Sequence, residues 1–486
     1  MASSPEPANN PNPRWMQNPP AWLRTRISRT LNRFSDPDLL QARRQKYEHK
    51  RQAQKQRHQV EYFHQFADPY CHLTAQILKK LVQNYDIELR CHVITSFGGK
   101  NQPFAEDLIR YSRADAERVA PFYGLNFPTE APIKPQQHLQ KVAAEALCNL
   151  HGSAFTEHIQ EVSQALWTGD SATLKGLSLQ NPNRKQVDQS LAAGNQAIRK
   201  MGHYSGGSFF YAGEWYWGVD RLFHLEDRLR SLDAERQPST DPTGQTGQTR
   251  HIISRPPIEI GPLDAATVQE MELHFFPSLN SPYTAIIYDK TIALKQACGI
   301  PFYHKPVLPM IMRGVPITSA KGRYIFSDAK REANFLGVPF GPSMTPIGEP
   351  VRRAYSLMTW ARSQGKDEAF MSALLRLAFS QHTGLHTETG MRLAVEQAGL
   401  DWHQARQRLG NDSWQLPTLA YQTEMADQMN LWGVPSFRLK GPAGWPDLSV
   451  WGQDRLWLIA AEISKRAGAR TQQPAAQSAA TSASIS

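Results

Sequence analysis

Apolar and polar positions along this chain form two similar series, and each series begins with a predicted strand. Residues 60–66 and 273–279 are short apolar runs rich in aromatic and branched side chains, which is typical of buried strands. A second strand is predicted at residues 87–94 of the first series and near residues 306–312 of the second. Both series therefore open with the same elements in the same order.

Between its first two strands, each series has a turn of the form x-Pro-Tyr-x followed by the pattern of a helix. The turns are Asp68-Pro69-Tyr70-Cys71 and Ser281-Pro282-Tyr283-Thr284. Proline is favoured in the first turn of a helix, and Asp and Ser are favoured as the capping residue before it. On spacing alone, Ser281 is therefore predicted to be an N-cap.

A long, mostly helical middle follows in each series, and two strands and a last helix close it. The helical pattern is clearest at residues 140–150 and 351–364. Aromatic and branched runs around a glycine-containing turn predict the closing strands within residues 209–226 and 436–465. The sequence thus predicts an α/β protein in which each sheet carries a helical insertion.

The pattern Trp-Gly-x-Asp-Arg-Leu lies near the end of both series, at residues 217–222 and 451–456. Motifs that recur in the same order at similar spacing indicate two copies of one domain. A chain of 486 residues is also too long for one core and suits two domains of about 200 residues. We expect a basic extension (1–58), a first domain (59–235), a linker (236–267), a second domain (268–470) and a disordered tail (471–486).

Composition narrows the class of protein. A hydrophobic fraction of 40% with interspersed charge is typical of a soluble globular chain, and no apolar run approaches the roughly 20 residues that cross a bilayer. Four cysteines without a Cys-x-x-Cys pair argue against a disulfide framework and a zinc site. We therefore expect a cytoplasmic protein without a bound metal.

The net charge of +10 is concentrated near the N-terminus, where residues 1–58 hold twelve Lys or Arg against four Asp or Glu. Apolar residues recur there at helical spacing between arginines: Trp22, Leu23, Ile27, Leu31 and Phe34. Such a basic amphipathic helix could lie on a membrane surface or dock on a partner, but packing on its own chain is the simpler interpretation. No RNA-binding signature accompanies the charge, so no nucleic-acid partner is expected.

Three motifs in the second series point to a family: Ser281-Pro282-Tyr283, Gly433-Val434-Pro435 and Gly452-Gln453-Asp454-Arg455. With these motifs in this order, residues 271–465 resemble the DsbA-like thioredoxin-fold family. The resemblance is to its glutathione-using branch, which contains kappa-class glutathione transferases and 2-hydroxychromene-2-carboxylate isomerases. A weaker match, to a glutathione-contacting segment of kappa enzymes, begins at Lys321. The resemblance implies two tandem thioredoxin-like domains of the DsbA type, each with a helical insertion.

Ser281 stands where disulfide oxidoreductases of this fold have the first cysteine of Cys-x-x-Cys. The backbone N–H groups and the dipole at a helix N-terminus favour negative charge, which is why cysteines at such sites have lowered pKa values. A serine hydroxyl cannot exchange disulfides, but it can donate a hydrogen bond to a thiolate that a ligand supplies. The resemblance implies that this ligand is glutathione.

The resemblance also implies how glutathione would be held. Backbone groups of Val434, beside a cis-Pro435, would pair with its cysteinyl residue like an added strand. Asp454 would bind the ammonium of the γ-glutamyl end, and Lys321 could take a carboxylate. Kappa enzymes commonly have a small hydroxyl residue at the position of Gln453, so the chain departs from the family in this part of the site.

The first series departs further. Its turn places Asp68 at the nucleophile position, where a carboxylate would repel a thiolate, and Cys71 at the second cysteine position without a local partner. The loop expected to hold the cis-proline reads Tyr204-Ser205-Gly206-Gly207-Ser208, without proline. We expect a degenerate, structural domain here, with Asp68 and Cys71 as an alternative site.

These residues predict a glutathione-dependent isomerase or transferase that acts on an electrophilic small molecule through a thiolate stabilised by Ser281. Two alternatives stay open: a DsbA-related thiol-disulfide oxidoreductase that uses Cys71, and a non-catalytic thioredoxin-fold scaffold. Related single-domain proteins are commonly dimers, so the two copies could pair internally as a pseudo-dimer, or the chain could form a homodimer. Substrate determinants would lie in the helical insertions, residues 128–191 and 342–429.

Overall fold

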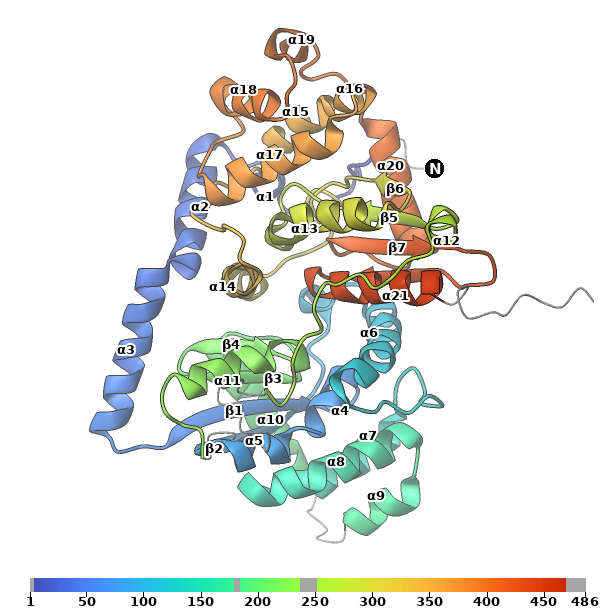
Figure 1. The fold of residues 1–486 in the computed structure, drawn as a ribbon. Helices are drawn as coiled ribbons and strands as arrows, with labels where there is room; N and C mark the ends of the chain where they lie inside the picture. The colour runs from blue at the N-terminus through green and yellow to red at the C-terminus, as the bar shows by residue number, and fades with distance from the viewer. Residues whose placement is uncertain (1–3, 179–183, 237–250, 469–486) are drawn as a thin grey trace, which may run out of the picture.

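The structure, a computed structural model, describes residues 4–178, 184–236 and 251–468. These residues form two α/β halves, each with a four-stranded sheet; the first half is in the lower part of Figure 1 and the second half in the upper part. The linker residues 237–250 and the predicted disordered tail at 471–486 lie outside the described residues.

The first half contains a mixed sheet with the strand order β2-β1-β3-β4. Its central strand, β1 (His58–Gln65), is parallel to β2 (Ile87–Ile94) and antiparallel to β3 (Ser208–Tyr211). The hairpin partner of β3 is β4 (Glu214–Trp217). The strands predicted at 60–66 and 87–94 and the closing hairpin are therefore confirmed.

The second half repeats this arrangement with the order β6-β5-β7-β8. Here β5 (Glu272–Phe276) is parallel to β6 (Phe302–His304) and antiparallel to β7 (Ser436–Lys440). The antiparallel partner of β7 is β8 (Leu448–Trp451). The two sheets thus share strand order and strand direction.

One strand prediction in the second half is wrong. The strand lies at Phe302–His304, and residues 306–312 have no regular structure apart from turns. Val307, Leu308 and Met312 are nonetheless fully buried. Prolines at positions 306 and 309 cannot donate to a sheet, which favours an irregular path. The apolar pattern here reflects a buried loop.

Helices cover both sheets. In the first half they are α4 (Pro69–Ala75), α5 (Leu78–Asn84), α6 (Ala105–Val119), α7 (Gln137–Leu147), α8 (Gly152–Thr168), α9 (Ser171–Leu177), α10 (Arg184–Met201) and α11 (Leu222–Arg230). In the second half they are α12 (Ala265–Gln269), α13 (Pro282–Cys298), α14 (Ser319–Leu336), α15 (Glu349–Ser356), α16 (Met358–Ser363), α17 (Asp367–Ser380), α18 (Glu388–Gln397), α19 (Trp402–Arg406), α20 (Gln415–Thr423) and α21 (Leu456–Gly468). The helix expected at 140–150 is α7, whereas the helical pattern at 351–364 corresponds to two helices, α15 and α16.

The N-terminal extension forms α1 (Arg14–Gln17), α2 (Ala21–Ser35) and α3 (Pro37–Ala53). Although it precedes the first half in sequence, α2 packs on the second half: Ser28 Oγ accepts the backbone N–H of Thr345 at 2.9 Å. Helix α3 then leads down to the first half, where Arg44 pairs with Glu214 at 2.7 Å (Figure 1). The extension therefore packs on its own chain and connects both halves. Contact with a membrane surface stays a prediction.

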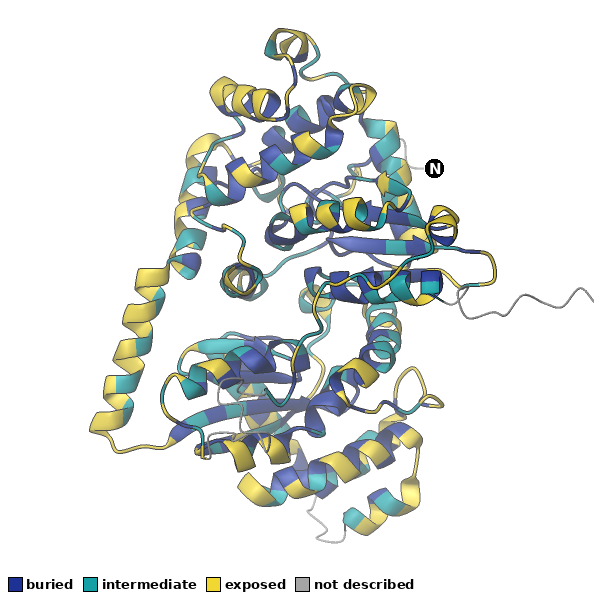
Figure 2. Cartoon of the chain, viewed as in Figure 1, coloured by how far each residue is buried: buried dark blue, intermediate teal, exposed yellow. Residues whose placement is uncertain are grey.

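The two halves share a hydrophobic contact. Trp457, at the start of α21, is buried, and its ring lies 4.9 Å from that of Phe122 and 6.0 Å from that of Tyr123, both from the first half. Figure 2 shows buried residues along the strands and on the facing sides of the helices, whereas α3 is largely exposed. Within the described ranges, no helix is both long and apolar enough to cross a membrane.

Candidate functional site between the two halves

Ser281 caps α13 and also contacts the loop before β7. Its Oγ accepts the backbone N–H of Thr284 at 3.1 Å and donates to the carbonyl oxygen of Val434 at 3.3 Å. The Val434–Pro435 peptide bond is cis, as the resemblance implied. The capping role of Ser281 and its position beside the cis-proline loop are therefore compatible, because one hydroxyl group serves both contacts.

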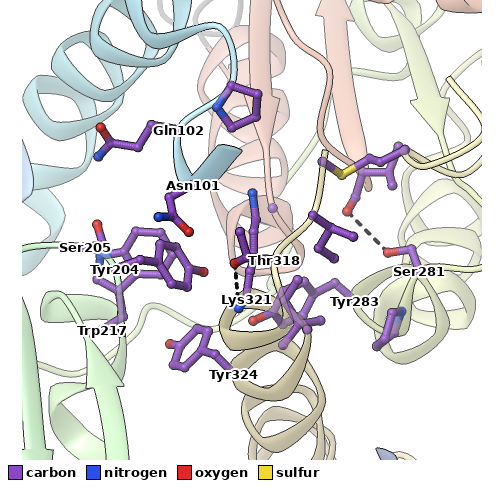
Figure 3. Close-up of a pocket in the computed structure, with 18 of the residues that line it drawn as sticks. Asn101, Gln102, Tyr204, Ser205, Trp217, Ser281, Tyr283, Thr318, Lys321 and Tyr324 are labelled. Atoms are coloured by element: carbon purple, nitrogen blue, oxygen red, sulfur yellow. Dashed lines mark hydrogen bonds between the residues drawn. The ribbon is translucent and has the colours of Figure 1, made fainter. Parts of the chain in front are cut away.

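A cavity of about 1100 Å³ lies between the two halves, and both x-Pro-Tyr turns line it. Figure 3 shows Lys321 between Ser281, on the side of the second half, and a group of first-half residues that includes Tyr204 and Trp217. Of the predicted site residues, those that line the cavity are Asp68, Ser281, Lys321, Val434, Gln453 and Asp454. Tertiary structure thus brings both turns to one space.

Asp454 forms an ion pair with the opposite half. Its Oδ2 lies 2.7 Å from Nη1 of Arg221. Burial by itself would raise the pKa of Asp454, but Arg221 and Arg455 outweigh this effect, so the pKa is lowered and the carboxylate is charged. The reciprocal contact joins Asp220 to Arg455 at 3.0 Å. The repeated Trp-Gly-x-Asp-Arg-Leu element therefore connects the two halves.

Each of these arginines also binds a helix of the opposite half. Arg221 lies 3.0 Å from Asp328 of α14, and Arg455 lies 2.8 Å from Asp115 of α6. All four side chains are at most 7% exposed. Because a buried charge is tolerated only when it is paired, these contacts hold the halves in one arrangement around the cavity.

Gln453 is engaged in the same interface. Its Nε2 donates to Glu332 of α14, which also pairs with Arg255 at 2.6 Å. The Oε1 atom of Gln453 is buried and has no hydrogen-bond partner among the described residues. Gln453 therefore has a structural contact, and one acceptor atom remains unused.

Lys321 lies in the first turn of α14, where its backbone N–H donates to Thr318 Oγ1 at 3.3 Å. Its side chain forms no ion pair with any residue that the structure describes. Burial lowers the pKa of the Lys321 ammonium to about 8. A cation that loses water without gaining a carboxylate is favoured to bind an anionic group.

The fold of the second half agrees with a comparison of sequences. The sequence model described as the DSBA-like thioredoxin domain matches residues 272–464, from the start of β5 to the body of α21. Residues 272–464 are a DSBA-like thioredoxin domain. The cis-proline loop and the Ser281 turn thus lie inside this DSBA-like domain, and the first half shares its strand order.

Solved structures similar to the chain include a 2-hydroxychromene-2-carboxylate isomerase, which is 19% identical and matches 42% of this chain and 100% of its own, with a TM-score of 0.34. They also include a protein described as a probable DsbA oxidoreductase from Streptomyces coelicolor, which is 17% identical and matches 43% of this chain and 94% of its own, with a TM-score of 0.33. No curated protein matches the chain.

In the first half, the position that corresponds to Ser281 of the DSBA-like domain holds Asp68. Its side chain caps α4 by accepting the backbone N–H of Tyr70 at 2.9 Å. Burial raises the pKa of this carboxyl group to about 6. Asp68 lines the cavity, so it can present either a neutral or a charged carboxyl group to a ligand near neutral pH.

Cys71, unlike Asp68, is not among the residues that line the cavity. Its side chain is fully buried, its Sγ accepts the backbone N–H of Gln65 at 3.2 Å, and burial raises the pKa of the thiol well above its usual value. Gly206 lies against it: a Cβ atom there would be 2.9 Å from the sulfur. The Gly-Gly loop that replaces the cis-proline loop thus covers the thiol.

Sequence reasoning missed the aspartates that complete the interface. The hydroxyl of Tyr283 donates to Asp328 at 2.8 Å, and that of Tyr70 donates to Asp115 at 2.7 Å. The tyrosine of each x-Pro-Tyr turn is thereby linked to the arginine of the opposite half. A signal was present, because Tyr-x-x-x-Asp occurs at 111–115 and again at 324–328.

Proposed function

We propose that the protein is a glutathione-dependent isomerase or transferase that acts on an electrophilic small molecule in the cavity between its halves. One observation carries the proposal: the hydroxyl of Ser281 caps α13 at the wall of this cavity and lies 3.3 Å from the carbonyl oxygen of Val434 in the cis-proline loop. A thiol placed beside Ser281 would meet a hydroxyl donor and the N-terminal end of a helix.

The proposed binding mode follows the polar groups of the cavity wall. The backbone of Val434 pairs with the cysteinyl residue of glutathione in the manner of an added strand. The unpaired ammonium of Lys321 takes a carboxylate. Arg221 already occupies Oδ2 of Asp454, and Oδ1 lies 3.7 Å from Arg455, which leaves Oδ1 to accept the γ-glutamyl ammonium.

The reaction then uses the thiolate as a nucleophile. The thiol gives its proton to solvent, and the hydroxyl of Ser281 turns from Val434 to donate to the sulfur. A carbon–sulfur bond forms as the π pair of a conjugated double bond moves to the activating carbonyl group. Rotation about the carbon–carbon bond that has become single, followed by expulsion of the thiolate, restores the double bond in the isomer. Protonation of the adduct instead completes a transfer.

Calorimetric titration with glutathione tests the proposal in the full chain. Wild type should bind, and ultraviolet absorbance should show bound thiolate at neutral pH. Ser281→Ala should reduce the thiolate signal at saturating glutathione, whereas Ser319→Ala, at an exposed serine of the same cavity, should not. The absence of binding at millimolar glutathione would overturn the proposal, as would an equal thiolate signal in Ser281→Ala.

The oxidoreductase that would use Cys71 gains no support from the geometry, because the thiol is buried behind Gly206 and its pKa is raised.

A further inference from the structure

Helix α2 of the N-terminal extension forms one wall of the cavity. Its apolar residues Leu23, Ile27, Leu31 and Phe34 line the space and are half-buried, whereas Arg24, Ser28 and Ser35 are the residues that it buries. An amphipathic helix normally packs its apolar side on the core. Here Leu31 and Phe34 also pack against the hydrophobic core, whereas the residues that α2 buries are polar, and Leu23 and Ile27 face the cavity.

The attachment ties α2 to the Ser281 turn. Ser28 Oγ accepts the backbone N–H of Thr345, and the hydroxyl of Thr345 donates to Oδ1 of Asn280 at 2.7 Å. Asn280 directly precedes Ser281. Two hydrogen bonds therefore connect α2 to the residue that precedes Ser281, and α2 and the Ser281 turn line one continuous cavity.

The neighbouring wall has the same aliphatic character. Met310, Ile311 and Ile317, from the segment between β6 and α14, line the cavity together with Ile347. Most of this lining is branched or flexible hydrocarbon. Binding an apolar ligand to such a surface is favourable because apolar area is removed from water. The surface contributes few groups that could fix the orientation of a polar ligand.

The same cavity carries unpaired positive charge. Arg26, Lys134 and Arg323 line it and form no ion pair with a residue that the structure describes, and the same is true of Lys321. The lining acids Asp220 and Asp454 are neutralised by arginines, which leaves Asp68 and Glu106. This excess of positive charge favours an anionic head group on the ligand.

We infer that α2 and the segment 310–317 form a binding subsite for an amphipathic aliphatic anion, a long-chain carboxylate. The hydrocarbon chain lies against Leu23 and Ile27, and the head group lies near the basic residues. As the substrate of the reaction, this molecule would also carry the electrophilic double bond; that part of the inference rests on the proposed function, whereas binding at the subsite does not.

Dansyl-labelled undecanoic acid, which fluoresces on entering an apolar site, tests the inference in the full-length protein without glutathione. Wild type should bind the probe, and decanoate should displace it. Ile27→Glu should weaken binding at least about tenfold, because a buried aliphatic contact is lost and a charge is added. The matched control is Trp22→Glu on the same helix, where the side chain is 66% exposed and does not line the cavity; its affinity should stay that of wild type.

Thermal unfolding followed by circular dichroism checks that the variants fold, and Leu23→Ser is the milder replacement if Ile27→Glu does not. The inference is overturned if wild type does not bind the probe, if the cavity variants bind like wild type, or if naphthoate displaces the probe better than decanoate. Glutathione calorimetry on the same samples separates the two proposals: glutathione binding without probe binding overturns only this inference, and probe binding without glutathione binding overturns only the proposed function.

Discussion

Arg221 of the first half and Asp454 of the second half form an ion pair of 2.7 Å at the wall of the cavity, and their counterparts Asp220 and Arg455 form another of 3.0 Å. Each half therefore supplies the charge that neutralises the other. Because these arginines are buried, separation of the halves would break the ion pairs, and water would have to solvate the acidic partners in place of the arginines. The element that looks like a duplicated binding motif is thus also the contact that joins the halves.

Loss of Arg221 should destabilise the protein strongly. Arg221→Ala leaves Asp328, Asp454 and Glu332 without a cation that now lies within 3.4 Å of each, and breaking a buried network of this kind costs about 3 to 5 kcal/mol. Urea unfolding measures the change. The control is Arg392→Ala in the exposed pair with Glu396, which should cost less than about 1 kcal/mol. Equal losses would contradict a structural role for the interface pair.

Asp68 should make stability depend on pH. The pKa of Asp68 is raised from 3.8 to about 6 by burial, so between these values the folded chain binds more protons than the unfolded chain. The free energy of unfolding should therefore fall as pH rises through this window, by up to about 3 kcal/mol. Asp68→Asn keeps a capping residue and removes the charge, so it should stabilise the protein at pH 7 and flatten the profile.

The matched control for Asp68→Asn is Asp170→Asn, at the N-cap of α9. Hydrogen bonds from Thr173 lower the pKa of that carboxyl group, so its effect on stability has the opposite sign to that of Asp68. The charged Asp170 stabilises the folded protein at neutral pH, and this stabilisation is lost as the pH falls below the usual pKa of an aspartate. Asp170→Asn should thus lower stability at pH 7. The burial argument fails if both variants change stability in the same direction.

The cysteine thiols should react slowly in the folded protein. Burial raises the pKa of all four thiols, and Cys71 and Cys148 are buried as well. Ellman's reagent should therefore label less than one thiol per chain at neutral pH until guanidinium unfolds the protein, after which all four should react. Rapid labelling of a protein that retains only Cys71 would restore the oxidoreductase alternative.

Gly433 should not tolerate a side chain. A Cβ atom there would lie 1.9 Å from the indole of Trp451, whose backbone is held by the hydroxyl of Tyr111 through contacts of 2.8 and 3.0 Å. Gly433→Ala should displace the loop that carries Val434, lowering both stability and glutathione affinity. Gly322→Ala, inside α14 with open space around it, should instead stabilise the protein by about 1 kcal/mol. Urea unfolding measures the stability of the two variants, and calorimetric titration measures their affinity for glutathione.

Several local features were readable from the chain because they depend on neighbours in sequence. Apolar runs and helical patterns placed β1, β2 and α7, and Ser281 before Pro-Tyr marked a helix start. The strand near 306–312 failed because an apolar pattern reports burial, not backbone conformation. The split of residues 351–364 into α15 and α16 also escaped the pattern, since both helices keep the same helical period.

The sequence by itself determined the two similar sets of elements and the residues that form the Ser281 turn, because turn, cap and strand signals act over a few neighbouring positions. Only the tertiary structure decided that Asp454 binds Arg221, that Cys71 is covered, and that α2 turns its apolar side to the cavity. Partners of a buried charge and walls of a cavity come from segments hundreds of residues apart, and their choice depends on how the two halves pack.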